Sequence, residues 1–351
     1  MKRRLSRTIH VRGLAIGGGN PISVQSMTNT PTDDVEATLA QIRRLESAGC
    51  QIVRLAVPNA VAARALSEIR KGTDMPLVAD IHFDYKLALA AVEAGFDKIR
   101  INPGNIGSPD RVRLVADACR DHGVPIRIGV NSGSVEKELL ARYGLTAQAL
   151  YESAMGHARL LEDCGFEDIC ISLKASSVPL TVAAYRLAAE TFPYPLHVGV
   201  TETGLSYNGT IQSAVGIGTL LNEGIGNTIR VSLTAPPQEE VRAGIAILKA
   251  CGLRTGGVRF VSCPTCGRTQ IDLISLASEV QKRLEGVPRD ITVAVMGCVV
   301  NGPGEAKEAD YGIAGGKDSG VLFRKGEVLG TYPQQELCDQ LIKTILKEEN
   351  L

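Results

Sequence analysis

The chain has 351 residues, of which 44% are hydrophobic and only 4% aromatic, and it contains no tryptophan. This length is sufficient for one large domain and a smaller one. The 38 basic and 38 acidic side chains leave no net charge. No overall field therefore attracts nucleic acid or an anionic membrane, so any anion site must be local.

The longest apolar runs are too short to span a bilayer. The basic start, from Met1 to Arg7, leads directly into strand-like sequence without an apolar segment or a cleavage-like site. We therefore expect a cytoplasmic protein without a leader peptide. The nine cysteines are scattered along the chain, which favours reduced thiols and a metal site over a disulfide framework.

Residues 5–20 predict a short hairpin that closes one end of a larger fold, with the stretch Gly17 to Asn20 as its turn. After it, short apolar strands alternate with helical stretches. The expected strands are Ser23 to Thr28, Ile52 to Val57, Leu77 to Phe83, Lys98 to Asn102, Ile126 to Asn131, Ile169 to Lys174, Leu196 to Thr201 and Thr228 to Thr234. The expected helices include Asp34 to Ala48, Tyr85 to Ala94, Arg111 to His122, Thr146 to Cys164, Val182 to Thr191 and Gln238 to Cys251.

Eight strand–helix units over roughly 230 residues are typical of a (β/α)₈ TIM barrel, and a doubly wound open sheet is the alternative. The pattern changes character after residues 251–257, so we expect a barrel over residues 1–253 and a second domain over 254–351. That second part predicts a smaller α+β unit. Its expected elements are the strand Val258 to Ser262, the helix Asp272 to Leu284, the strands Ile291 to Met296 and Tyr311 to Ala314, a hairpin through Val321 to Tyr332 and the helix Gln334 to Lys347.

Within the barrel strands, apolar side chains alternate with polar ones, and the polar set should face the barrel interior. That inward set contains five cations: Arg54, Arg100, Arg127, Lys174 and Arg230. Barrel interiors are ordinarily filled by aliphatic side chains, and an unpaired buried charge is costly. A single cation of this kind would pair with a helix carboxylate, but five on one face predict a bound anion, and arginine suits bidentate contact with phosphate.

Three further polar residues of the barrel are candidates for the same site. Asp80 and His82 share the inward face, either as a hydrogen-bonded pair or as groups that act on a substrate. Glu202 directly follows a strand, where barrel enzymes keep their acids, although a plain loop carboxylate is the alternative.

The second domain carries a pattern of metal ligands. Cys263 and Cys266 form a Cys-x-x-Cys loop, and Cys298 follows the apolar run Ile291 to Met296. With no fourth cysteine nearby, Glu305 is the closest candidate for the remaining position. Spacing alone leaves a structural zinc ion and an iron–sulfur cluster about equally supported, but a carboxylate in fourth place favours the cluster.

Five segments closely resemble the 4-hydroxy-3-methylbut-2-enyl diphosphate synthase family of the methylerythritol phosphate pathway. They are Gln25 to Thr30, Ala79 to Phe83, Arg100 to Asn105, Cys263 to Arg268 and Met296 to Glu305. The resemblance covers essentially the whole chain and is similar to the bacterial two-domain form. It implies a reductive ring opening of 2-C-methyl-D-erythritol 2,4-cyclodiphosphate with loss of water.

The resemblance also implies roles for particular residues. It implies a [4Fe–4S] cluster held by Cys263, Cys266, Cys298 and Glu305, with Glu305 and Glu202 as catalytic residues. It implies substrate contacts from Arg54, Arg100, Arg127, Asn131, Lys174 and Ser232, with Arg230 nearby, and we add Asp80 and His82 to that set. Flavodoxin or ferredoxin as electron donor and a homodimer are implied as well.

Two other functions compete with this interpretation. One is a pterin- or phosphate-handling barrel enzyme with a structural zinc module and no redox chemistry. The other is a cluster-based redox sensor whose barrel is only a scaffold, against which the cationic barrel lining argues.

Overall fold

The chain forms two compact units, Met1–Arg254 and Thr255–Leu351, each with its own apolar core. The computed structural model describes residues 2–298 and 306–350. Each unit is treated by itself below.

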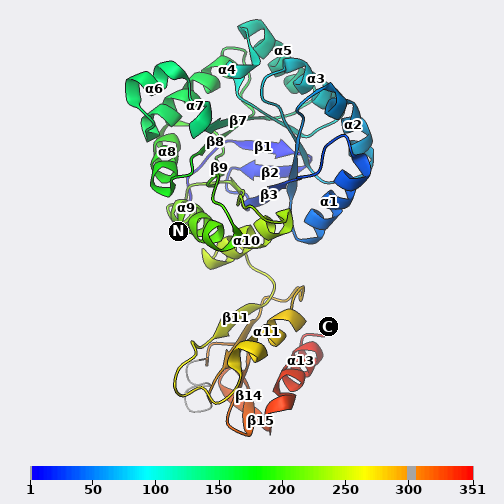
Figure 1. Cartoon of the computed structure of the whole chain (residues 1–351), viewed down its shortest axis with the longest axis vertical. Coiled ribbons are helices and arrows are strands. Elements are labelled where there is room, and N and C mark those ends of the chain that lie inside the picture. Colours follow the sequence, from blue (N-terminus) through cyan, green and yellow to red (C-terminus); the bar gives the residue numbers. More distant parts are fainter. Residues whose placement is uncertain (1, 299–305, 351) are drawn as a thin grey trace. The chain divides into compact units, whose positions relative to one another are not determined.

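The first unit is a barrel of eight parallel strands inside a ring of helices (Figure 1). Its strands are hydrogen-bonded in the order β8-β7-β6-β5-β4-β3-β10-β9, and a parallel bridge between Ile171 and Leu196 closes the ring. The predicted (β/α)₈ barrel is therefore confirmed, and the open sheet is excluded. The strands are β3 (Ser23–Met27), β4 (Ile52–Ala56), β5 (Leu77–Asp80), β6 (Lys98–Ile101), β7 (Ile126–Asn131), β8 (Ile169–Lys174), β9 (His197–Val198) and β10 (Thr228–Ile229).

Several of the barrel helices begin at a polar side-chain cap and bury one apolar face. In α1, for example, the Asp34 side chain accepts a hydrogen bond from the Ala37 amide, while Ile42 and Leu45 are buried against the strands. The helices are α1 (Val35–Ser47), α2 (Ala60–Lys71), α3 (Tyr85–Glu93), α4 (Pro103–Ile106), α5 (Pro109–Asp121), α6 (Lys137–Tyr143), α7 (Ala147–Glu162), α8 (Val178–Thr191), α9 (Ser206–Asn222) and α10 (Pro237–Ala250), with a short 3₁₀ helix η1 (Ser132–Ser134).

The N-terminal hairpin closes one end of the barrel, as the sequence predicted. Strands β1 (Thr8–Val11) and β2 (Leu14–Gly17) place Ile9, Val11 and Ile16 against Ile52, Val78 and Cys170 of the barrel strands. The predicted turn was wrong. The hairpin turns at Arg12 and Gly13, whose φ angles of 47° and 79° suit a two-residue hairpin loop. Gly17 is the last residue of the second strand, and Gly18 to Asn20 follow it.

Three barrel strands are shorter than predicted by more than one residue. The ladder of β5 ends at Asp80, so His82 and Phe83 lie in the loop that follows, and β9 and β10 contain only two residues each. Gly199, directly after β9, is closely surrounded. A Cβ atom there would lie 2.4 Å from the Arg230 carbonyl oxygen and 2.7 Å from Lys174 Nζ, so the position has room for the lysine only without a side chain.

The second unit is a five-stranded mixed sheet in the order β11-β12-β13-β14-β15. Leucine, valine and isoleucine side chains of α11 and α13 pack on one face of this sheet, and a smaller alanine-rich cluster lies on the other. Its elements are β11 (Arg259–Ser262), α11 (Leu273–Arg283), β12 (Thr292–Met296), β13 (Tyr311–Ala314), β14 (Ser319–Arg324), β15 (Glu327–Pro333), the 3₁₀ helix η2 (Gln334–Glu336) and α13 (Leu337–Glu348).

Among the described residues, none of the helices combines the length and the apolar character that a membrane crossing requires.

The hairpin packing generates a stability prediction. Ile16 is fully buried between the hairpin and the barrel strands, so Ile16→Ala should lower the free energy of unfolding of the barrel by about 3 kcal/mol. The matched control is Val61→Ala on the outer surface of α2, where the side chain is 50% exposed and the change should stay within about 0.5 kcal/mol. Urea unfolding of both variants measures the difference. Equal stabilities would show that the hairpin contributes nothing to the barrel core.

Candidate functional site

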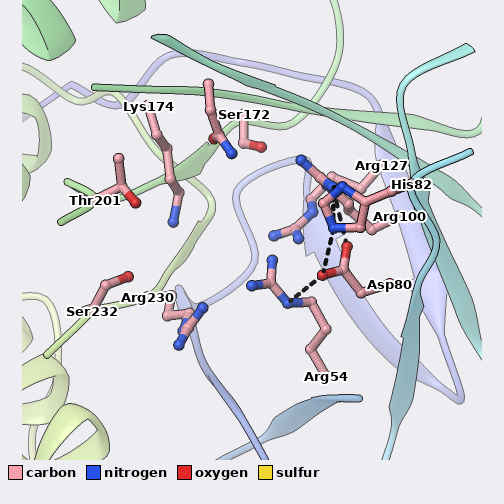
Figure 2. A pocket seen from close by; sticks show the side chains of 11 residues that line it. Arg54, Asp80, His82, Arg100, Arg127, Ser172, Lys174, Thr201, Arg230 and Ser232 are labelled. Carbon is pink, nitrogen blue, oxygen red and sulfur yellow. Dashed lines mark hydrogen bonds and ion pairs between the residues drawn. The ribbon is translucent and has the colours of Figure 1, made fainter. Parts of the chain in front are cut away.

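The carboxyl ends of the barrel strands surround a polar cavity of about 180 Å³. Figure 2 shows that Arg54, Arg230 and Lys174 reach toward it from different strands. The lining residues are Arg54, Asp80, His82, Arg100, Arg127, Asn131, Ser172, Lys174, Thr201, Arg230 and Ser232. All nine residues predicted to contact the substrate are therefore gathered here, together with Ser172 and Thr201, and their role stays a prediction.

Asp80 holds one side of the cavity together. Its Oδ1 accepts a hydrogen bond from Arg100 Nη1 at 3.2 Å, and its Oδ2 lies 3.8 Å from Arg54 Nε and 3.5 Å from His82 Nε2. Burial alone would raise the pKa of Asp80, but Arg54, His82 and Arg100 hold it well below its ordinary value. Asp80 is therefore ionised; it holds Arg100 by a hydrogen bond and attracts Arg54 at a longer distance. The expected Asp80–His82 pair is present. His82 lies at the edge of this charged group, and its side chain is 57% exposed.

Gly129 on β7 makes room for Arg100. Arg100 Nη2 donates a hydrogen bond to the Gly129 carbonyl oxygen at 2.7 Å, and a Cβ atom on Gly129 would lie 2.2 Å from Arg100 Nε. The Asn102 side chain accepts a hydrogen bond from the Gly129 amide at 3.0 Å. A side chain at this position would displace the guanidinium from the cavity wall.

Arg230 is paired with a carboxylate from outside the barrel. Its Nε and Nη2 lie 3.1 Å from the two oxygens of Glu240, on helix α10, and Glu240 also accepts hydrogen bonds from the Ser26 hydroxyl and the Leu233 amide. The alternative interpretation of the sequence was that an inward cation pairs with a helix carboxylate at the barrel rim. For Arg230 this interpretation is correct. Arg230 nevertheless keeps its place in the cavity lining.

The remaining charge has no partner among the residues that the structure describes. Within the described part of the chain, Arg127 Nε and Nη1 have no hydrogen-bond acceptor and the Lys174 ammonium forms no ion pair. Burial lowers the pKa of Arg127 to about 10, and burial together with Arg230 and Arg127 lowers that of Lys174 well below its ordinary value. Five lining cations against Asp80 and Glu240 leave an excess of three positive charges, which an anion in the cavity would neutralise.

A buried layer lies beneath the cavity, and the sequence reasoning missed the lysine in it. Lys98 on β6 is fully buried, and neither its Nζ nor the two ring nitrogens of the buried His197 have a partner among the described residues. Burial, more than the neighbouring cations, lowers the pKa of Lys98 to about 8. The sequence could have indicated this position. Lys98 stands two residues before Arg100 in the same strand, so both side chains face the barrel interior.

Glu202 lies outside the residues that line the cavity. It follows β9 in the loop before α9, with an exposed side chain and a φ angle of 57°. An L-residue in this left-handed region is strained by about 1 kcal/mol or more, and such strain concentrates at functional loops.

In the second unit, two cysteine-bearing loops leave neighbouring parallel strands. Cys263 follows β11 and Cys298 follows β12, and these strands pair Ser262 with Val295. The Gly297 amide donates a hydrogen bond to Cys263 Sγ at 3.2 Å. The pKa of the Cys266 thiol is lowered, first by a hydrogen bond from the Arg268 backbone. Hydrogen bonds of this kind favour thiolate.

The donor set fits a thiolate-held group by its chemistry. All nine cysteines are free, and the two loops start side by side at one end of the sheet. Glu305, the predicted fourth ligand, lies outside the described residues. Among the residues that are described, no three His, Cys, Asp or Glu side chains are close enough together to hold a metal ion.

A closed parallel barrel with a cationic cavity at the carboxyl ends of its strands is typical of a barrel enzyme that acts on a small molecule. Comparison with known families is more specific. Residues 6–245 match the GcpE TIM-barrel domain and residues 259–347 match the GcpE protein C-terminal domain. The chain therefore belongs to the GcpE family, which is the family of 4-hydroxy-3-methylbut-2-enyl diphosphate synthases that the sequence motifs indicated.

The curated relatives align over nearly their full length. The chain is 57% identical to a 4-hydroxy-3-methylbut-2-en-1-yl diphosphate synthase (flavodoxin) of Caldanaerobacter subterraneus, covering 98% of both chains. It is 58% identical to the protein of the same name in Geobacter sulfurreducens, covering 97% of both.

Solved structures of another enzyme share the barrel. A dihydropteroate synthase from Stenotrophomonas maltophilia superimposes with a TM-score of 0.51 at 16% identity, covering 70% of this chain and 97% of that one. This likeness shows the fold alone, and it gives no support to a pterin-handling function.

The buried Lys98 makes stability depend on pH. Its pKa is about 8 in the folded protein against an ordinary 10.5, so between these values the unfolded chain binds more protons and stability rises with pH. The free energy of unfolding of the wild type, relative to Lys98→Met, should rise by up to about 3 kcal/mol across this range. Urea unfolding at several pH values measures the difference, with the exposed Lys86→Met as control. A flat difference would contradict the assignment.

Proposed function

We propose that the cationic cavity binds 2-C-methyl-D-erythritol 2,4-cyclodiphosphate and that the enzyme opens its ring reductively, with loss of water, to (E)-4-hydroxy-3-methylbut-2-enyl diphosphate in non-mevalonate isoprenoid biosynthesis. Family membership and the names of the relatives support this activity. The observation that carries it is the excess of three positive charges in the barrel, because the two negative charges of a cyclic diphosphate would offset most of that excess. Neither alternative function receives support from the relatives.

The barrel residues have two tasks in this reaction. Arg54, Arg127 and Lys174 bind and orient the diphosphate, since their charges are not cancelled by Glu240. When a ring C–O bond to the diphosphate breaks, its electron pair remains on the phosphate oxygen. The same cations then stabilise the charge that develops there. Because the cavity is small and largely enclosed by protein, their field is weakly screened.

Glu202 is proposed to move a proton at the cavity mouth. The departing hydroxyl needs a proton to leave as water, and a loop carboxylate beyond the strand ends is in the right part of a barrel to supply it. The strained left-handed conformation of Glu202 supports a functional role.

We infer that the second unit holds a [4Fe–4S] cluster through Cys263, Cys266, Cys298 and Glu305. The adjacent strand ends and the amide hydrogen bond to Cys263 Sγ support this ligand set. Such a cluster, when bound, supplies single electrons and a Lewis-acidic iron. Glu305 is proposed as the exchangeable ligand and therefore as a catalytic residue.

The partners follow from the same proposal. The names of the relatives specify flavodoxin, so we propose a flavodoxin as electron donor, with ferredoxin as the alternative. A homodimer and a cytoplasmic location are also proposed.

A pair of variants separates the two parts of the site. Arg127→Met should weaken the binding of inorganic pyrophosphate about 10- to 100-fold, since it removes hydrogen bonds between charged groups, and should leave iron and sulfide content unchanged. Cys298→Ala should lower the iron and sulfide content and leave the binding of pyrophosphate unchanged. Calorimetry and iron–sulfide analysis after anaerobic purification measure both. Zinc instead of iron in the wild type would overturn the cluster, and loss of iron in Arg127→Met would make that residue structural.

Two variants at Glu202 distinguish the effect of its backbone strain on stability from the effect of its carboxylate on turnover. Glu202→Gln should lower kcat by about 10²-fold or more. Glu202→Gly should also lose turnover but raise the free energy of unfolding by about 1 kcal/mol, because glycine adopts the left-handed conformation freely. Lys325→Gly is the matched control, since Lys325 has a φ angle of 47° in the β14–β15 turn. It should gain similar stability and keep full turnover. Full turnover in Glu202→Gln would rule out the proton-transfer role.

A further inference from the structure

The sulfur of Met27 lies between two arginines of the cavity. Met27 is the last residue of β3, and it pairs in register with Arg54 on the neighbouring strand β4. Its Sδ atom accepts hydrogen bonds from Arg54 Nε at 3.0 Å and Nη2 at 2.9 Å, and Arg230 Nη1 lies 3.7 Å away. Half-buried Met27 does not itself line the cavity.

Arg54 depends on this sulfur for its orientation. Met27 Sδ is the hydrogen-bond acceptor of its guanidinium among the described residues, whereas the nearest carboxylate oxygen, Asp80 Oδ2, is 3.8 Å away and outside hydrogen-bond distance. A thioether is a weak acceptor. Its use by two nitrogens of one guanidinium is therefore unusual and calls for a physical reason.

The reason is charge. Three arginines at the mouth of the barrel are linked through three acceptors: Glu240 holds Arg230, Met27 lies between Arg230 and Arg54, and Asp80 holds Arg100. Two of these acceptors are carboxylates, and each cancels a positive charge. The acceptor in the middle is neutral, so it orients Arg54 without adding negative charge to the cavity. A third carboxylate would reduce the excess of three charges to two.

We propose that Met27 is a positioning residue of the diphosphate site, which fixes Arg54 relative to Arg230 through its sulfur while preserving the positive charge of the cavity. This inference rests on the proposed function, in that it takes the cavity to bind a diphosphate. It differs from a packing role, for which a leucine of similar volume would serve equally well.

Three substitutions at this position distinguish acceptor, charge and volume. Met27→Leu keeps the volume and removes the acceptor, Met27→Gln keeps a neutral acceptor, and Met27→Glu supplies a charged one. The control is Met75→Leu, because Met75 is buried in the barrel core and does not line the cavity. Calorimetric titration of inorganic pyrophosphate into the anaerobically purified proteins gives Kd, and steady-state turnover of the cyclodiphosphate gives kcat and KM.

We expect Met27→Leu to weaken pyrophosphate binding about three- to tenfold, which is the effect of losing one ordinary hydrogen bond. Met27→Gln should bind within about twofold of wild type, and Met27→Glu should bind more weakly than Met27→Leu because one positive charge is cancelled. KM should follow Kd, while iron content and thermal stability stay constant. Met75→Leu should bind like wild type.

Equal binding by wild type, Met27→Leu and Met27→Glu would overturn the inference. If Met27→Leu fails to fold, the comparison of Met27→Gln with Met27→Glu decides: tighter binding by Met27→Gln supports it, and equal binding overturns it. Failure of the wild type to bind pyrophosphate would instead refute the proposed function of the cavity.

Discussion

The structure depends on positive charge held inside a barrel without enough negative charge beside it. Arg127 and Lys174 are buried and lack acceptors among the described residues, an arrangement that disfavours the empty protein and favours any anion that enters. The fold confines this charge to one end. The β1–β2 hairpin seals the other end with isoleucine and valine. The apolar packing that stabilises the barrel and the polar cavity therefore lie at opposite ends of the same strands.

Local features then keep the cations apart from one another and aimed at the cavity. Asp80 orients Arg100, Glu240 orients Arg230, and neither carboxylate removes the excess charge. The absent side chains of Gly129 and Gly199 provide space for Arg100 and Lys174. Together these features make a preorganised site, in which little reorganisation is needed when a phosphate arrives.

The barrel and its inward cations were predictable because strand alternation has a fixed period of two, so Arg54, Arg100 and Arg127 could be assigned to one face. Glu240 could not be predicted, since a helix residue reaches the barrel interior only through the packing of α10 on β3, which leaves no periodic signal. The hairpin turn was predicted at the wrong place because both Arg12–Gly13 and Gly17 to Asn20 contain glycine and could form a turn. Only the pairing register of the two strands shows which of them does. The proposed positioning role of Met27 could not be predicted from the sequence, because a methionine in a strand is ordinarily expected to pack in the hydrophobic core.

The use of guanidinium rather than ammonium has a consequence for how the cavity charge depends on pH. Four of the five lining cations are arginines, and burial leaves the pKa of Arg127 at about 10. A guanidinium with such a pKa stays ionised when the pH near neutrality changes by one unit. The arginine share of the cavity charge is therefore insensitive to acidity, whereas the buried ammonium of Lys174, whose pKa burial lowers well below its ordinary value, gives up its proton more readily.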